Sequence, residues 1–405
     1  MSGSLHIALD AVVLPRPAAA GAIIQAWEAG RAVLPLDPAA PAPATRRLLD
    51  VSRPTHLVDA DGRRRLPGGR PVAAEVAAVV TTSGTAGTPK AVELTVAGLR
   101  AASLVTSAAL GAGPGDRWLA CVPLHGVAGL AIVGRSWHTG VPLTVQEGFD
   151  EALVEEAAGH GATLVSLVPT MLRRLLAAGS DLRAFRRILL GGGPVPPDLL
   201  TQAAELELGV VTTYGLTETC GGVVHNGHPL DRVTLAVGGP GDEGEIRIRG
   251  PMVMRGYHDD QAATDAALRG GWLHTGDQGR LAEGGRLLVL GRRDDLILSG
   301  GVNVHPVEVE RVLAGHPGVR DVAVAGAPDP EWGQRVVAFV VPAQPADPPS
   351  LDQLRGFVRQ RLAAANAPRD LVLVAELPRS PSGKLLRRRL DAAPSALRHQ
   401  DSGGR

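Results

Sequence analysis

The sequence has no excess charge of either sign. Its 405 residues include 41 basic and 41 acidic side chains, so the formal net charge is zero. A balanced charge gives no electrostatic reason to expect nucleic acid or an anionic membrane surface as the main partner. We therefore expect the partners of this chain to be small molecules.

Cysteine is scarce, with only Cys121 and Cys220, and the two do not form a CxxC pair. This argues against a disulfide framework and against a structural zinc site. The sequence also lacks a clean apolar run of about 20 residues that could span a membrane. Near the N-terminus, Asp10 interrupts the apolar run and no basic signal-peptide start precedes it. We expect a soluble, cytoplasmic protein.

Lysine is the scarcest charged residue, because it occurs only at Lys90 and Lys384 while arginine fills every other basic position. A bias toward arginine explains the many arginines, but it does not explain where the two lysines remain. Both lie in segments rich in glycine, serine, threonine or proline. We treat both as candidate functional residues. The alternative is that lysine remains at these two positions by chance and that both side chains are merely solvated.

Helical patterns alternate with short β-branched runs, which predicts an α/β fold with a parallel sheet covered by helices. The expected strands are residues 77–82, 118–122, 163–167, 187–190 and 210–213. The expected helices between them are residues 151–158, 169–178 and 197–206.

From about residue 244 the pattern changes to closely spaced strands and turns. Ile246 and Ile248 alternate with arginines, which predicts a half-exposed antiparallel sheet. A small α+β unit is expected to follow, with a helix that begins at Pro306. Its other expected elements are strands at 321–324 and 336–341 and a helix at 351–364.

The length of the chain predicts two domains rather than one. We place a large domain of helix-covered sheets at residues 1–293 and a small mobile domain at 294–395. Residues 396–405 form a polar, glycine-containing end that we expect to be disordered.

The segment TTSGTAGTPKAVELT, residues 81–95, crowds hydroxyl residues and glycines into a loop that ends at Lys90. Backbone N–H groups, hydroxyl donors and one ammonium in the same small volume predict a phosphate-binding loop. It is not a Walker A loop, because GK[ST] is missing and β-favouring residues follow the lysine. The alternative is a mobile hairpin. The candidate phosphate-binding residues are Thr82, Ser83, Gly84, Thr85, Gly87, Thr88 and Lys90.

Two further loops follow predicted strands directly. GGGPVPPDLL, which contains Gly192 and Gly193, follows the strand RRILL, and TYGLTETCGG follows the strand at 210–213. Open α/β sheets bind ligands where strands give way to loops. We therefore expect both loops to border the same site as the phosphate-binding loop.

The TYGLTE segment offers groups suited to a nucleotide. Tyr214 supplies a flat face and Gly215 allows close backbone approach, as a purine would require. Thr217 and Glu218 supply a hydroxyl and a carboxylate suited to phosphate and Mg²⁺. Alone this pattern is weak, since a glutamate after a turn is usually solvated, but beside a phosphate-binding loop it becomes specific.

The TGD segment predicts that Asp277 lies in a tight turn between strands, where a carboxylate could accept both ribose hydroxyls. The alternative is a turn aspartate bonded to its own backbone. Arg292 is a further candidate for the nucleotide site, and the alternative for it is a surface salt bridge.

Taken together, these segments resemble the superfamily of acyl-CoA synthetases, peptide-synthetase adenylation domains and beetle luciferases. The resemblance runs in order from about residue 76 to 392, through TSGTAGTPK, YGLTE, GEIRIRGPMVMRGY, GWLHTGD, GRRDD and PSGK. Within it the chain is most similar to the o-succinylbenzoate–CoA ligases of menaquinone synthesis, through PLHGVAGLAIVGRS, SLVPTMLRRLL and DLILSGGVNVHPVEVE.

The resemblance implies an AMP-forming acid:CoA ligase that uses ATP, Mg²⁺ and coenzyme A. It makes Lys384 the bridge between the acid and the α-phosphate, Lys90 a phosphate ligand and Glu218 the metal ligand. It also makes Asp294 a hinge. Ser299, Gly300 and Gly301 would then line the channel for the pantetheine arm of CoA.

The chain departs from the family pattern at two places. His125 is followed by Gly126 where the group has an aromatic residue or a histidine followed by a histidine, which puts a gating or substrate role of the second position in doubt. Leu298 stands where many acyl-CoA ligases have a lysine, so one basic contact is missing.

An acid with two carboxylates needs a basic group in its pocket for the one that is not activated. Arg135 is the candidate, with His125 near the pocket wall, and the alternative for Arg135 is a solvated arginine. One alternative is a ligase for another aryl or fatty acid. A free-standing adenylation domain would normally be accompanied by a Gly-x-Asp-Ser carrier element, which this sequence does not contain, and a non-enzymatic adenylate-binding protein is disfavoured because Lys384, Glu218 and Asp277 are all present. The resemblance is also compatible with a homodimer.

Overall fold

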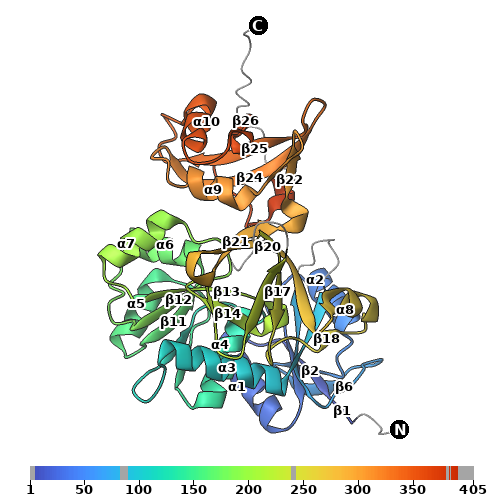
Figure 1. The fold of residues 1–405 in the computed structure, drawn as a ribbon. Coiled ribbons are helices and arrows are strands. Elements are labelled where there is room, and N and C mark those ends of the chain that lie inside the picture. The colour runs from blue at the N-terminus through green and yellow to red at the C-terminus, as the bar shows by residue number, and fades with distance from the viewer. Residues whose placement is uncertain (1–4, 83–89, 239–242, 380–382, 384, 391–405) are drawn as a thin grey trace. The chain divides into compact units, whose positions relative to one another are not determined.

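The computed structural model describes residues 5–82, 90–238, 243–379, 383 and 385–390. The chain forms two compact units (Figure 1). Unit 1 comprises residues 1–192, 206–236 and 247–274, and unit 2 comprises residues 193–205, 237–246 and 275–405. The predicted small domain, 294–395, falls within unit 2, which also contains residues 275–293. The predicted division at residue 293 stays a prediction. The predicted disordered end, 396–405, lies outside the described residues.

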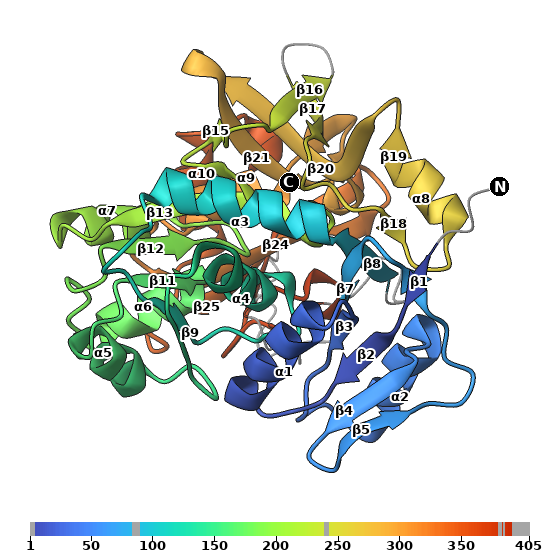
Figure 2. The same ribbon diagram turned by 90° about the horizontal axis from the view of Figure 1, so that it is seen from below.

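The first sheet of unit 1 has seven strands in the order β18-β8-β7-β3-β2-β4-β5. The strands β2, β3, β4 and β7 run parallel, while β8 pairs antiparallel with β7 and with β18. Helix α1 packs on β2 and β3 (Figure 2). The bounds are β2 (Leu9–Val12), β3 (Ala32–Pro35), β4 (His56–Asp59), β5 (Gly62–Arg65), β7 (Val76–Thr82), β8 (Lys90–Thr95), β18 (Gly256–Tyr257), α1 (Arg16–Glu28) and α2 (Ala42–Ser52). A short pair, β1 (His6–Ile7) and β6 (Val72–Ala73), lies apart from this sheet.

The second sheet confirms the predicted parallel architecture. Its order is β10-β9-β11-β12-β13-β14-β15, with parallel pairs from β10 to β13 and antiparallel pairs from β13 to β15. The bounds are β9 (Trp118–Ala120), β10 (Leu143–Val145), β11 (Leu164–Leu167), β12 (Arg187–Leu190), β13 (Val210–Leu216), β14 (Gly221–His225) and β15 (His228–Pro229).

The helices between these strands begin where the sequence supplies a cap. Thr95 accepts a hydrogen bond from the N–H of Gly98 at the start of α3, and Asp150 does the same for Leu153 at the start of α5. Helix α4 packs on β9 and β14, so it covers one face of the sheet. The bounds are α3 (Val96–Leu110), α4 (Val127–Thr139), α5 (Glu151–Gly159), α6 (Pro169–Ala177) and α7 (Pro197–Glu205).

The third sheet follows the order β16-β17-β20-β19, and β21 also pairs with β20. The division between the two units falls inside β16, β17 and β20. Ile246 and Ile248 are fully buried, and the arginines between and after them are not, which confirms the predicted alternation. The bounds are β16 (Thr234–Gly238), β17 (Glu243–Arg249), β19 (Leu268–Arg269), β20 (Trp272–Ala282), β21 (Arg286–Arg292) and α8 (Gln261–Ala267).

The last sheet lies in unit 2, in the order β23-β22-β25-β24, with β26 on β25. Helix α9 begins at Pro306, as predicted, and α10 ends at Arg359, earlier than predicted, because its buried face stops at Val358. Strands β24 and β25 are longer than predicted because they pair with each other along their length. The bounds are β22 (Ile297–Ser299), β23 (Val302–Val304), β24 (Val319–Asp329), β25 (Gly333–Pro342), β26 (Asp370–Leu373), α9 (Pro306–Leu313) and α10 (Leu351–Arg359).

Two apolar clusters cover the two faces of this last sheet. One contains Val309, Leu313 and Leu354, from α9 and α10, and the other contains Phe339, Leu377 and Leu390. Within the described part of the chain, no helix has both the length and the apolar character needed to cross a membrane.

Candidate active site

The predicted phosphate-binding loop joins two strands of one hairpin in unit 1. β7 ends at Thr82 and β8 begins at Lys90, and these two residues pair across the hairpin. The Thr82 hydroxyl donates to the backbone oxygen of Lys90 at 3.4 Å. The predicted ligands Ser83, Gly84, Thr85, Gly87 and Thr88 lie outside the described residues. The strand that follows the lysine confirms that the loop is not followed by a helix.

Lys90 and Glu218 contact different parts of the Tyr257 side chain, the ring and the hydroxyl. The Tyr257 hydroxyl donates to Glu218 Oε1 at 2.9 Å, and Lys90 Nζ lies 4.6 Å from the centroid of the Tyr257 ring. Glu218 is placed by the 3₁₀ turn η1 (Thr217–Thr219), which follows β13 directly. The structure therefore brings two predicted catalytic residues, from segments far apart in the sequence, to one place in unit 1.

Glu218 is also the residue that fits magnesium. Among the described residues there is no group of three or more His, Cys, Asp or Glu side chains that could hold a metal ion. Mg²⁺ is commonly bound through one or two carboxylates together with substrate phosphates, and it keeps several waters. A single carboxylate near the predicted phosphate-binding loop suits that mode, and the role of Glu218 as the metal ligand stays a prediction.

Gly215 is explained by strand pairing. A Cβ on Gly215 would lie 1.9 Å from the backbone oxygen of Gly221 in β14, so the close approach of β14 itself requires glycine. Tyr214, one residue earlier, lies opposite Val224. The role of Tyr214 as a purine platform and the role of Thr217 toward phosphate stay predictions.

Asp277 does not lie in a tight turn, and this prediction was wrong. It lies inside the 11-residue strand β20, opposite Arg292 of β21. Glycines in GWLHTGDQG are typical of turns, but pairing with β21 keeps the segment extended, and Gly276 takes up a φ of +70°. Arg292 Nε lies 3.0 Å from Asp277 Oδ1. The two predicted nucleotide ligands thus form an ion pair within unit 2, and their binding of ribose stays a prediction.

Arg135 is buried, so the alternative of a solvated arginine is wrong. Its side chain extends from α4 and donates to Ser166 Oγ of β11 at 3.2 Å, and its guanidinium lies 4.4 Å from the Trp118 ring centroid. The residue is 5% exposed. Burial lowers the pKa of Arg135 to about 9, and no described carboxylate acts against this shift. The charge of Arg135 therefore lacks an anionic partner within the described part of the chain.

His225, at the end of β14, is buried within the electrostatic reach of Arg135. Burial, and then the charge of Arg135, lower the pKa of His225 to about 4, so the ring is neutral at pH 7. Neither ring nitrogen of His225 has a hydrogen-bond partner among the described residues, and the same holds for Arg135 Nε, Thr213 Oγ1 and Trp118 Nε1. Buried polar groups normally have partners, so this cluster is suited to a polar ligand.

His125 lies just before α4 and is half-buried. Its pKa is lowered mainly by burial, with Asp37 opposing the shift and Arg16 adding to it. Gly126, at the position where the family pattern departs, is the N-cap of α4. No described hydrogen bond joins His125 to Arg135, so their shared role at the acid stays a prediction.

Ser299, Gly300 and Gly301 form the tight turn between β22 and β23. Ser299 pairs with Val302, and the two glycines between them have φ values of +59° and +79°. Positive φ at both central residues is the usual requirement of a two-residue hairpin. A Cβ on Gly300 would lie 2.6 Å from Trp332 Cε3, so the indole ring also excludes a side chain there. Contact of this turn with pantetheine stays a prediction.

Asp294 lies in the 3₁₀ turn η4 (Arg293–Asp295) and is exposed, and its role as a hinge stays a prediction. Leu298, at the other departure from the family, is 53% exposed, so the apolar substitution faces solvent.

Gly192 and Gly193 follow β12 in the predicted loop, and Gly192 has a φ of +82°, which favours glycine. Their contact with nucleotide is untested.

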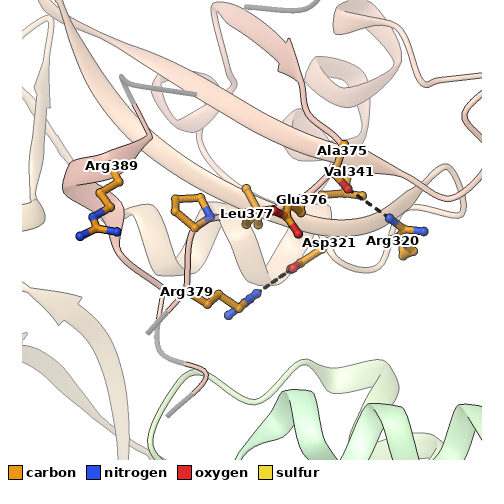
Figure 3. A pocket seen from close by; sticks show the side chains of 9 residues that line it. Arg320, Asp321, Val341, Ala375, Glu376, Leu377, Arg379 and Arg389 are labelled. Atoms are coloured by element: carbon orange, nitrogen blue, oxygen red, sulfur yellow. Dashed lines mark hydrogen bonds and ion pairs between the residues drawn. The ribbon is translucent and has the colours of Figure 1, made fainter. Parts of the chain in front are cut away.

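Lys384 lies outside the described residues, but the residues on either side of its loop are anchored. Arg379 Nη2 donates to both carboxylate oxygens of Asp321, at 3.0 and 2.7 Å, and Arg379 Nη1 donates to the oxygen of Gly383 at 3.1 Å. Arg379 also forms a backbone bridge with Leu385. Figure 3 shows Arg379 pointing toward Asp321. Both residues, together with Arg389, line a hollow of about 500 Å³.

Arg387 explains part of the basic run that follows Lys384. Its guanidinium donates to Glu310 and to the backbone oxygen of Val324, and its Nε lies 3.3 Å from Asp295 Oδ2. The Arg387 side chain is 15% exposed, so it holds η6 (Arg387–Arg389) against the core of unit 2. The contacts of Arg387 are therefore structural.

Sequence reasoning missed three residues of these clusters: Tyr257, Ser166 and His225. Tyr257 ends the motif GEIRIRGPMVMRGY, and it is one of only two tyrosines in the chain, so its scarcity was a usable signal. Ser166 lies in the quoted segment SLVPTM, but a single serine carries no pattern of its own. His225 comes near Arg135 because α4 packs on β14, a tertiary contact that the sequence does not indicate.

Comparison with known proteins places these features in a family. The AMP-binding enzyme family matches residues 60–258, and the AMP-binding enzyme C-terminal domain matches residues 308–384. The 2-succinylbenzoate–CoA ligase of Geobacillus kaustophilus is 41% identical over 338 residues, which cover 78% of this chain and 69% of that protein. A probable 2-succinylbenzoate–CoA ligase of Mycobacterium tuberculosis is 41% identical over 358 residues, which cover 85% of this chain and 92% of that protein.

Solved structures agree with this similarity. The o-succinylbenzoate CoA synthetase of Bacillus subtilis in complex with the acyl-adenylate intermediate OSB-AMP superposes with a TM-score of 0.86 at 30% identity, over 97% of this chain and 90% of that chain. The same enzyme in complex with ATP and magnesium ion gives a TM-score of 0.84 at 30% identity, over 96% and 90% of the two chains.

Proposed function

The chain belongs to the family of AMP-binding enzymes, and we propose that it is a 2-succinylbenzoate–CoA ligase that works through an acyl-adenylate. In the first half-reaction a carboxylate oxygen of 2-succinylbenzoate attacks the α-phosphorus of ATP and pyrophosphate leaves. In the second, the CoA thiolate attacks the acyl carbonyl and AMP leaves. The resemblance assigns this reaction to menaquinone biosynthesis.

The first half-reaction joins two anions, so cations and oriented donors must offset their repulsion. Thr82 and Lys90 are proposed to hold the outgoing phosphates, and Lys384 to bridge the acid and the α-phosphate. Glu218 would hold Mg²⁺, which would supply charge neutralisation at the phosphate oxygens. Asp277 and Arg292 are proposed to hold the ribose. For the second half-reaction, the turn formed by Ser299, Gly300 and Gly301 is proposed to border the pantetheine arm.

The burial of Arg135 without a described anionic partner is the observation that supports 2-succinylbenzoate as the acid substrate. A buried guanidinium without a carboxylate partner is costly, and a dianionic substrate would supply the missing charge. Ser166 accepts a hydrogen bond from the guanidinium, and the unpartnered groups of His225 and Thr213 are proposed as further polar contacts for the same carboxylate. A fatty acid would leave Arg135 unpaired, so this alternative accounts less well for the buried charge.

The test compares two acids in two enzymes. Wild-type enzyme and Arg135→Leu are assayed by ATP–pyrophosphate exchange with 2-succinylbenzoate and with 4-oxo-4-phenylbutanoate, which lacks the ring carboxylate. We expect Arg135→Leu to lose on the order of 100-fold in kcat/KM for 2-succinylbenzoate, the scale for truncating one partner of a buried charge pair. The analogue should lose little, because it has no second carboxylate to pair with Arg135.

Two results would contradict this proposal. If Arg135→Leu lost the same factor in kcat/KM with both acids, Arg135 would not recognise the second carboxylate. Strong turnover with fatty acids or simple benzoates, and none with 2-succinylbenzoate, would overturn the assignment of the substrate itself. Addition of CoA to each assay then separates a CoA ligase from an adenylate-binding protein, because only the ligase forms a thioester.

The need for ATP and CoA supports a cytoplasmic location for this reaction. A homodimer, which the resemblance allows, is decided by the mass of the protein in solution.

A further inference from the structure

Tyr257 contacts a cation with one part of its side chain and an anion with another. Its hydroxyl donates to Glu218 Oε1 at 2.9 Å, and Lys90 Nζ lies 4.6 Å from the centroid of its ring. A hydrogen bond to an ionised carboxylate is stronger than one between neutral groups. An ammonium over an aromatic face is attracted by the ring quadrupole. One side chain thus holds both charged residues of the phosphate site.

This arrangement keeps Lys90 and Glu218 from neutralising each other. Two opposite charges in contact attract strongly, and an ion pair between them would compete with phosphate for the lysine and with Mg²⁺ for the carboxylate. Among the described residues, Lys90 contacts the Tyr257 ring and Glu218 accepts from the Tyr257 hydroxyl. The second oxygen of the Glu218 carboxylate can then serve the metal ion, and the three N–H donors of Lys90 can serve phosphate oxygens.

The backbone of Tyr257 is fixed by the strand that carries Lys90. Tyr257 pairs with Val92 of β8, two residues after Lys90, and the N–H of His258 donates to the oxygen of Ala91 at 2.8 Å. On the other side, the N–H of Tyr257 donates to Thr264 Oγ1 at 2.8 Å. The distance between Lys90 and the Tyr257 ring is therefore set within one strand pair.

Polar side chains next to Tyr257 stabilise this strand pair, and two of them, Glu93 and His258, are buried. Glu93 Oε1 lies 2.8 Å from His258 Nδ1, and Arg255 Nη1 donates to Glu93 Oε2 at 2.7 Å. Burial raises the pKa of Glu93, but the hydrogen bonds from His258 and Arg255 outweigh it and hold the pKa below its usual value. Glu93 stays ionised at neutral pH and joins β8 to the residues on both sides of Tyr257.

From this geometry we infer that Tyr257 is a positioning residue for MgATP: its hydroxyl orients the Glu218 carboxylate toward the metal ion, and its ring face holds the Lys90 ammonium for the phosphates. The inference rests on the proposed function only in that the enzyme binds MgATP. It concerns no part of the acid pocket and no part of the CoA site.

Two variants separate the hydroxyl from the ring. Tyr257→Phe removes the hydrogen bond to Glu218 and keeps the ring, whereas Tyr257→Leu removes both. ATP binding is measured by calorimetry over a series of Mg²⁺ concentrations and again in EDTA. For Tyr257→Phe we expect the Mg²⁺ concentration at half-maximal effect to rise about tenfold, the lower end for losing a partner of a metal ligand. Its affinity for ATP in EDTA should stay unchanged.

Tyr257→Leu should show the same rise in Mg²⁺ requirement and should also bind ATP in EDTA about two- to fivefold more weakly, since the cation–π contact is lost. A matched control is Glu75→Gln, which breaks an exposed ion pair with Arg255, two residues before Tyr257. This control should bind MgATP like the wild type. Thermal unfolding of each variant shows whether the fold is kept, and Tyr257→Phe preserves the volume of the ring.

A wild-type Mg²⁺ requirement in Tyr257→Phe would overturn the role of the hydroxyl. Equal ATP affinities of Tyr257→Phe and Tyr257→Leu in EDTA would overturn the role of the ring. Neither result depends on the acid, because the measurements use ATP and Mg²⁺ alone. Failure of the proposed substrate would instead appear as wild-type enzyme that binds MgATP but makes no thioester from 2-succinylbenzoate.

Discussion

His225 is an uncharged base at pH 7 because it is buried near the guanidinium of Arg135. Its pKa is about 4 in the folded chain, against an ordinary value of 6.5. As pH falls through 6.5 the unfolded chain binds a proton at this histidine, while the folded chain does not do so until about pH 4. The folded state therefore loses stability as pH falls between these two values, and it keeps its full stability above them.

We predict that His225→Phe makes the unfolding free energy less dependent on pH between about 6.5 and 4. The shift of His225 corresponds to about 3 kcal/mol lost across this window, at 1.36 kcal/mol for each unit of pKa. Phenylalanine keeps a ring of similar size and binds no proton. Urea unfolding at a series of pH values measures the slope directly. An unchanged slope would show that another group controls acid destabilisation.

Several residues of the site were predictable because their chemistry is local. Lys90 was identified from its loop and Glu218 from a short turn, and the structure places both next to Tyr257. The buried state of Arg135 was not predictable, since an arginine in a helical segment is usually solvated. Its burial follows from the packing of α4 on β9 and β14, which is a property of the whole sheet.

At the scale of single elements, the turn between β22 and β23 contains a position, Gly300, at which both the backbone conformation and a neighbouring side chain require glycine. Gly300 and Gly301 both have positive φ, but only Gly300 faces a neighbour, the ring of Trp332. The backbone N–H of Gly300 also donates to the oxygen of Trp332 at 2.9 Å. The turn is thus held against β25 by a hydrogen bond and by close packing.

We predict that Gly300→Ala destabilises the protein by about 2 to 4 kcal/mol, because a strained φ and a steric clash with Trp332 add together. Gly301→Ala is the matched control: its φ is also positive, but the space around it is open, so it should cost only about 1 kcal/mol. Urea unfolding followed by circular dichroism compares the two variants. Equal costs would mean that the indole ring moves aside.

The elements that the sequence predicted best are those with a clear local period and clear ends. The strand at 187–190 coincides with β12, and the predicted start at Pro306 coincides with that of α9. The sequence predicted poorly where pairing overrides local preference. β20 passes through the glycines of the TGD segment because β21 pairs with it, and β24 and β25 extend each other well beyond their apolar cores.

At the scale of the whole molecule, the proposed reaction needs two different arrangements of the same chain. Lys384 is proposed to act only while the acid attacks ATP, and CoA must afterwards reach the carbonyl where that lysine had been. A hinge at Asp294 would allow this change, as closure and reopening do in other enzymes. Asp294 is exposed and lies in a short turn, so a change there disturbs no buried contact.

We predict that two variants each slow a different half-reaction. Lys384→Ala should lower ATP–pyrophosphate exchange about 10² to 10³-fold, the scale of losing one transition-state donor, and should leave thioester formation from supplied acyl-adenylate intact. Asp294→Pro should slow thioester formation at least tenfold, because proline fixes φ and restricts the preceding residue. The two rates are measured separately. The hinge proposal is lost if Asp294→Pro changes neither rate.

The contact of Lys90 with Tyr257 also gives this protein a built-in chemical reporter. Lys90 is exposed and carries one of only two lysine amines in the chain. A reagent selective for primary amines therefore has two side-chain targets, which fall in different peptides and are separated by mass. The extent of modification at Lys90 reads out how fully its ammonium is covered by the ring or by phosphate. The occupancy of the nucleotide site can thus be followed without a dye, a tag or an added cysteine.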